Sequence, residues 1–193
     1  MGVIKTALEI ALEKTESVKS DKASIELFEA RQRGKKLAGD FLSLEVNLET
    51  EIKNTPENQK ESLKQGIFDV LISKIILPAG KDDEMLVEKA GKGLQIIIKS
   101  KQFTLLYQQL TQIFSQYIQE ASHYEQAIRQ QYAPKLRQKE EELSRRFGRE
   151  VRIDPMQDPE FVGVLNQHMN ALKGNYQAVV DQMKEETRNL FNG

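Results

Sequence analysis

Apolar residues recur every three or four positions along most of this chain, which is the spacing of one face of an α-helix. The pattern is most regular in two long stretches, Phe103–Phe147 and Pro159–Phe191. The apolar stripe advances by about 3.7 residues per turn in the first stretch and by about 3.6 in the second, whereas a tightly wound coiled coil needs 3.5. We therefore predict two long and nearly straight helices.

Residues 148–158 separate these two stretches and have a different character. Gly148 suits the end of a helix, and Asp158-Pro159-Glu160 is typical of a helix start because it places negative charge at the positive end of the helix dipole. The sequence thus predicts a long antiparallel two-helix hairpin, coiled-coil-like, over residues 101–193, with its tip at 148–158. Pro134 lies inside the first of these helices and should bend it.

Residues 1–100 are predicted to form a helical head of about four helices. The first covers Val3–Val18. Ser20-Asp21 is expected to cap the second, which runs from Lys22 to about Lys53. Gly34, in the middle of that helix, predicts either a kink or the close approach of another helix.

The third predicted helix begins at Thr55-Pro56, with the threonine as its cap and the proline at the first helical position, and runs to about Leu77. A fourth is capped by Asp82 or Asp83. Its end, Leu94–Lys99, contains three consecutive isoleucines, which favour a strand. Because no second strand is available to pair with it, we predict a helix, and the fold class is all-α: a helical head with a long hairpin arm.

Composition limits the function more than the fold. The 193 residues include no cysteine, which excludes disulfides, thiolate metal sites and cysteine nucleophiles and agrees with a reducing compartment. The formal net charge is −1, so no overall basic field attracts nucleic acid. No apolar run approaches the roughly 18–20 residues that span a bilayer, and the N-terminus has no apolar signal core. We expect a cytoplasmic protein with no membrane span.

Motifs that carry catalysis do not occur in the sequence. Glu120-Ala-Ser-His123 matches the Glu-x-x-His element of ferritin-like di-iron bundles, but such a site needs a second copy, and Leu165 stands three residues before the other histidine, His168. The glycine–lysine pairs lack the spacing of a phosphate loop. We predict no metal, no cofactor and no enzymatic activity; a helical-bundle enzyme with a metal held by scattered carboxylates is the third hypothesis.

The tip is the first candidate binding surface. The chain changes there from basic to acidic, and its candidate partner-binding residues are Arg145, Arg146, Arg149, Arg152 and Asp154. A well-capped turn would account for the same residues without any partner. Under the functional interpretation, an arm that ends in arginines docks a protein.

A second basic cluster lies in the predicted head and comprises Arg31, Arg33, Lys35 and Lys36. Four cations at this spacing are an alternative polyanion-binding site, whose affinity would depend on salt. However, acidic residues flank the cluster, and no aromatic side chain lies among the cations to stack on bases. We therefore favour an ordinary solvated helix face, and nucleic acid is not the expected partner.

Parts of the sequence resemble an uncharacterised bacterial family of mostly helical proteins. The similar segments are Ala7–Thr15, Asp21–Ser24 and Gly34–Leu42, together with Arg152–Pro155 and Asp158–Phe161 at the tip. The resemblance covers most of the chain and implies a bacterial, cytoplasmic setting. It implies no site residue, because no activity is assigned to that family.

These observations lead to the prediction of a non-enzymatic scaffold or adaptor that acts through protein–protein contacts and forms a homo-oligomer. Two paired helices bury their apolar stripes only in part. We therefore expect a further helix, from the head, a second copy or a partner, to cover the remaining apolar surface. The alternative is a nucleic-acid or anionic-surface binder that uses the basic patches at 31–36 and 145–152.

Overall fold

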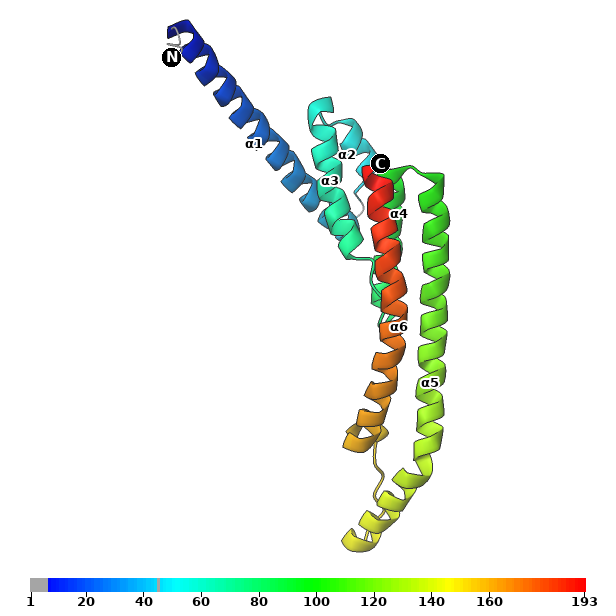
Figure 1. Ribbon diagram of the computed structural model, residues 1–193. Coiled ribbons are helices and arrows are strands. Elements are labelled where there is room, and N and C mark those ends of the chain that lie inside the picture. The colour runs from blue at the N-terminus through cyan, green and yellow to red at the C-terminus, as the bar shows by residue number, and fades with distance from the viewer. Residues whose placement is uncertain (1–6, 45) are drawn as a thin grey trace, which may run out of the picture. The chain divides into compact units, whose positions relative to one another are not determined.

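The computed structural model describes the backbone of residues 7–44 and 46–193 and the side chains of this part from Lys22 onward. Its described part contains α-helices, one short 3-10 helix and no strand, so the all-α prediction is confirmed (Figure 1). The elements are α1 (Ala7–Ser43), α2 (Leu48–Lys53), α3 (Glu57–Ser73), α4 (Lys81–Ile98), α5 (Lys101–Phe147), η1 (Pro155–Gln157) and α6 (Pro159–Asn192). The isoleucine run before Lys99 is helical, as predicted. Within these residues, none of the helices combines the length and the apolar character that crossing a membrane requires.

The chain divides into two compact units. The first consists of Met1–Ile75 and Met85–Ser100, and the second of Ile76–Glu84 and Lys101–Gly193. Residues Ile76–Glu84 therefore group with the second unit, although the sequence pattern places them in the predicted head.

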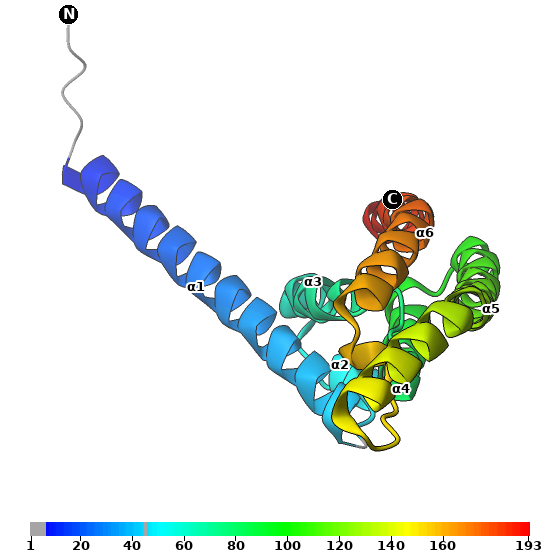
Figure 2. The same cartoon turned by 90° about the horizontal axis from the view of Figure 1, so that it is seen from below.

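In the first unit, the C-terminal half of α1 packs against α3 (Figure 2). The two backbones approach at a pair of glycines. A Cβ atom on Gly34 would lie 2.1 Å from the carbonyl oxygen of Leu63, and one on Gly66 would lie 2.0 Å from the carbonyl oxygen of Arg31. Of the two alternatives predicted for Gly34, the close approach of another helix is the correct one.

The predicted helix break at Ser20-Asp21 is wrong, because α1 continues without interruption from Ala7 to Ser43. Residues that cap helices well cost only a fraction of a kcal/mol inside one, so neighbouring helix-forming residues override them. The part of the first predicted helix before Ala7 lies outside the described residues. The real interruption comes before α2, where the side chain of Asn47 accepts a hydrogen bond from the Thr50 N–H at 3.1 Å.

The predicted start of the third helix is also corrected. Thr55 does not cap α3: its hydroxyl donates to the Glu51 carbonyl oxygen at 2.8 Å and accepts from Arg33 at 3.0 Å. Pro56 takes the capping position without a side-chain cap, and α3 ends at Ser73 rather than near Leu77. The threonine hydroxyl is used to close the preceding turn, so it is not available to the helix that follows.

In the second unit, α5 and α6 lie side by side and run in opposite directions (Figure 1). Aromatic contacts join them at two levels: the ring centroids of Tyr117 and Tyr176 are 5.3 Å apart, and those of Tyr132 and Phe161 are 5.5 Å apart. Figure 1 shows α5 bending toward its C-terminal end. The helix contains Pro134, which has no N–H for the carbonyl group four residues earlier.

Candidate functional site

The tip, residues 148–158, is a short ordered connection between α5 and α6. Gly148 has a φ of +65°, which lies in the left-handed region that glycine adopts at no steric cost. Two side chains near the end of α5 then hold the extended backbone that follows: Ser144 Oγ accepts a hydrogen bond from the Val151 N–H at 2.9 Å, and Glu140 Oε1 accepts one from the Ile153 N–H at 2.8 Å. The path of the tip is therefore fixed by the helix that precedes it.

Asp158 begins α6 and ties it to α5. Its Oδ1 accepts hydrogen bonds from the N–H groups of Glu160 and Phe161, both at 3.0 Å, as the predicted helix start requires. Its Oδ2 accepts a hydrogen bond from the Lys139 ammonium group at 2.5 Å. Glu160 pairs in the same way with Lys135. Two carboxylates at the start of α6 are thus neutralised by two lysines of α5.

Tyr132 lies beneath this group of charges. The ammonium groups of Lys135 and Lys139 are 5.4 and 5.8 Å from its ring centroid, and the edge of the ring meets Phe161, which is fully buried. The Tyr132 hydroxyl makes no hydrogen bond within ordinary geometric limits in the described part of the chain. Burial, followed by the nearby Glu160 carboxylate, raises the pKa of this hydroxyl.

The ion pairs at the start of α6 predict how stability depends on pH. The hydrogen bond from Lys139 lowers the pKa of Asp158, and the one from Lys135 lowers the pKa of Glu160. Above the pKa values of the unfolded chain, about 3.9 for Asp158 and 4.3 for Glu160, each carboxylate makes its full contribution to the free energy of unfolding. This contribution is lost as the pH falls through the lower pKa values of the folded protein. The pKa values of Lys135 and Lys139 are raised, so their contribution is lost only as the pH rises past about 10.4.

We expect the melting temperature of the protein to fall steeply below about pH 4. In a Lys135→Gln/Lys139→Gln double variant, the pKa values of Asp158 and Glu160 should return toward their ordinary values. The melting temperature of this variant should therefore fall less than that of the wild type as the pH is lowered. Circular dichroism melts between neutral and acidic pH measure both slopes. Identical slopes for the two proteins would show that these pairs do not contribute.

The predicted arginines surround this ordered tip and are exposed. Arg145 lies 3.7 Å from Glu141, and Arg152 lies 3.0 Å from Glu150, with 83% and 85% of the two arginine side chains exposed. Arg146 and Arg149 form no ion pair with any residue that the structure describes. The predicted Asp154 has a structural role, since its carboxylate accepts a hydrogen bond from the Met156 N–H at 3.0 Å and so caps η1.

A groove of about 790 Å³ runs between the end of α5 and the segment that enters α6. It is lined by Lys139, Glu142, Leu143, Arg145, Arg146, Ile153, Gln157, Asp158 and Pro159. Two large apolar side chains of the same region, Phe147 and Met156, are 61% and 49% exposed. The apolar periodicity places Phe147 on the buried stripe, but α5 ends at this residue and leaves its ring in solvent.

Two residues of the basic cluster in the first unit form hydrogen bonds with neighbouring elements. The Arg31 guanidinium donates two hydrogen bonds to Asp69 of α3, at 2.7 and 3.0 Å, and Arg33 donates to Thr55. Lys35 is half-buried, and Lys36 is exposed. Two of the four predicted cations, Arg31 and Arg33, are thus engaged by side chains of the same unit.

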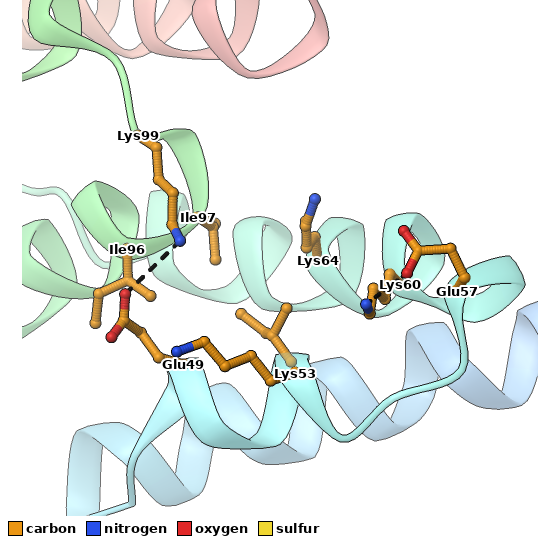
Figure 3. A pocket seen from close by; sticks show the side chains of 9 residues that line it. Glu49, Lys53, Glu57, Lys60, Lys64, Ile96, Ile97 and Lys99 are labelled. Atoms are coloured by element: carbon orange, nitrogen blue, oxygen red, sulfur yellow. Dashed lines mark hydrogen bonds and ion pairs between the residues drawn. The ribbon is translucent and has the colours of Figure 1, made fainter.

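The first unit also contains a pocket of about 280 Å³ that sequence reasoning missed (Figure 3). Its lining comes from α2, α3 and the end of α4: Glu49, Ile52, Lys53, Glu57, Lys60, Lys64, Ile96, Ile97 and Lys99. Figure 3 shows Lys53 and Lys99 pointing toward Glu49, and the Lys99 ammonium lies 3.7 Å from its carboxylate. The lysines come from α2, from α3 and from the residue that follows α4, so no local sequence motif indicates the pocket.

The histidines weighed as metal ligands lie apart on the two long helices, His123 on α5 and His168 on α6, and both are exposed. Among the residues that the structure describes, no three histidine, aspartate or glutamate side chains gather closely enough to hold a metal ion.

Comparison with known proteins places the chain without assigning it an activity. Neither the curated proteins nor the solved structures include a match. Residues 49–189, which contain every residue of the tip, the groove and the pocket, match the model of the family of unknown function DUF6657. The chain therefore belongs to this family, and the predicted resemblance to an uncharacterised family is confirmed.

Proposed function

We propose that this protein is a non-enzymatic adaptor whose tip is a docking surface for another protein. The observation that carries the proposal is the composition of the exposed surface at the tip. Phe147 and Met156 stand in solvent beside arginines whose side chains are more than four-fifths exposed. Aromatic residues, methionine and arginine are the types that are enriched where proteins meet.

The order of the tip supports the same proposal. A surface that is held in one conformation loses little conformational entropy on binding, so more of the contact energy remains as affinity. Here the hydrogen bonds from the Val151 and Ile153 N–H groups to α5, and those accepted by Asp158, fix the backbone on which the exposed side chains stand.

Site-directed photo-crosslinking tests this proposal. A photoreactive amino acid replaces Met156, and a matched control carries it at Gln116, an exposed position in the middle of α5. In cells of the source organism, we expect the tip probe to link one defined protein that the control does not link. Mass spectrometry identifies that protein, which is then purified and bound again. Labelling of the same proteins from both positions, or of none, would contradict the proposal.

The second candidate function is the binding of a polyanion through the basic patch at 31–36, in the first unit, or the one at 145–152, in the second. It is favoured by Arg146 and Arg149, which form no ion pair in the described part of the chain. Each cation that neutralises a phosphate makes affinity fall as salt rises. The exposed Phe147 and Met156 support the protein partner instead, since polyanion binding through phosphate contacts needs no apolar anchor.

Self-association stays a prediction, and we propose a surface for it in the second unit. A groove of about 430 Å³ lies between the start of α5 and the end of α6, and Leu105, which lines it, is 62% exposed. A second copy could cover this apolar side chain. Light scattering across a range of protein concentrations decides the point, because a monomer at every concentration would remove the homo-oligomer from the account.

A further inference from the structure

The pocket of the first unit is lined in part by two lysine side chains that are mostly covered. Only 25% of the Lys60 side chain and 28% of the Lys64 side chain are exposed. Their methylene stems form part of the pocket lining, beside Ile52, Ile96 and Ile97. The pocket therefore combines apolar walls with a cationic edge, which suits a ligand that is anionic at one end and apolar at the other.

Lys99 reaches this pocket from an unusual backbone position. Its φ is +50°, and among the described residues it is the one non-glycine residue with a positive φ. Its N–H bonds the Gln95 carbonyl oxygen at 3.2 Å, so it occupies the left-handed position that ends α4, where glycine is strongly preferred. A lysine here costs conformational energy, and its side chain extends into the pocket toward Glu49 (Figure 3).

From these observations we propose that the pocket binds a small molecule that carries a carboxylate or phosphate group and a short apolar portion. The anionic group would lie between Lys53 and Lys99, whose side chains both point toward Glu49 (Figure 3). The apolar portion would rest on Ile52, Ile96 and Ile97. The four lysines of the lining face its two glutamates and Glu61, the partner of Lys64, so one positive charge is left in excess for a bound anion.

The ion pairs already present do not block this role. Lys60 pairs with Glu57 and Lys64 with Glu61 one helical turn away, and the two glutamate side chains are 88% and 81% exposed. Lys99 lies 3.7 Å from a half-exposed Glu49. Ion pairs in which one partner is this exposed are weakened by water and screened by salt. A ligand anion can therefore replace a glutamate as the partner of a lysine at little cost.

Isothermal titration calorimetry of the full chain tests the proposal with four probes of matched length: hexanoate, hexyl phosphate, hexanol and hexylammonium. We expect hexanoate or hexyl phosphate to bind with millimolar or tighter affinity and the other two not to bind. Comparison of the two anions shows which head group the pocket prefers. Binding should weaken as sodium chloride is raised, because the contacts are electrostatic.

Variants at Lys99 separate binding from folding. Asparagine tolerates the left-handed conformation, so Lys99→Asn removes the charge while it keeps the backbone. We expect this change to weaken anion binding about tenfold, as for the loss of a hydrogen bond to a charged group. Lys99→Gly should bind as poorly and melt a few degrees higher, because it removes the conformational cost. The control is Lys92→Gln, on the same helix but outside the lining.

Three results would overturn the proposal. They are the absence of binding by either anion at low salt, equal binding of hexanol and hexanoate, and unchanged anion affinity in Lys99→Asn. Because the pocket belongs to the first unit and the tip to the second, each of these outcomes leaves the docking proposal for the tip unaffected.

Discussion

Replacement of Gly34 by alanine is expected to force α1 away from α3 and to lower the free energy of unfolding of the first unit by about 3 kcal/mol. The new Cβ would lie 2.1 Å from the Leu63 carbonyl oxygen, 3.0 Å from its carbonyl carbon and 3.1 Å from the Ile67 nitrogen. All three are backbone atoms, so no side-chain rotation relieves the contact. Ala30 and Ala38, buried on the same helix, would lose their packing when the helices separate.

The same α1 helix offers a matched control. A Cβ on Gly39 would meet no atom within 4 Å, so Gly39→Ala should raise stability by about 0.5–1 kcal/mol through helix propensity alone. Urea unfolding followed by circular dichroism measures both variants. If Gly34→Ala proves as stable as Gly39→Ala, the close crossing of α1 and α3 is wrong.

Replacement of Phe161 by alanine is expected to cost about 3–5 kcal/mol in the second unit. Phe161 is fully buried, in one cluster with Ile128, Tyr132, Leu136 and Leu165. Its ring meets the edge of Tyr132 and lies 5.7 Å from the Arg129 guanidinium carbon. The variant removes these contacts and leaves a cavity at the level where the start of α6 is anchored to α5.

Phe147→Ala is the matched control for this second prediction. The ring of Phe147 is 61% exposed, so its loss should change stability by less than about 0.5 kcal/mol. Denaturant unfolding compares the two variants under one set of conditions. Equal losses of stability would contradict the packing described at the tip end of α5 and α6.

The parts of the fold that could be predicted from the sequence are those that depend on local chemistry. Periodic apolar residues identified the helical segments. Gly148 and Asp158 act where the sequence placed them, because a left-handed helix end and a side-chain N-cap each involve only a few neighbouring residues. At Gly34 the sequence left a kink and the close approach of a helix as alternatives, and only the packing of α1 on α3 decided between them.

The errors arose where several local preferences compete or where distant segments meet. Ser20-Asp21 and Thr55 both have the chemistry of a cap, yet α1 continues through the first, and the second is engaged by Arg33 and Glu51. The lysine pocket is assembled from residues 49–99 on three helices, so it exists only after packing. The exposure of Phe147 likewise depends on whether another segment covers the end of α5, which periodicity does not determine.

The most direct test of the docking proposal is the affinity of the partner that the Met156 probe identifies. It is measured by calorimetry against the wild-type chain, Phe147→Ala, Arg146→Glu/Arg149→Glu and Lys36→Ala. The account predicts that each of the two tip variants weakens binding by at least about tenfold, as for a central contact of an interface, and that Lys36→Ala binds like the wild type. Wild-type affinity in both tip variants would contradict it.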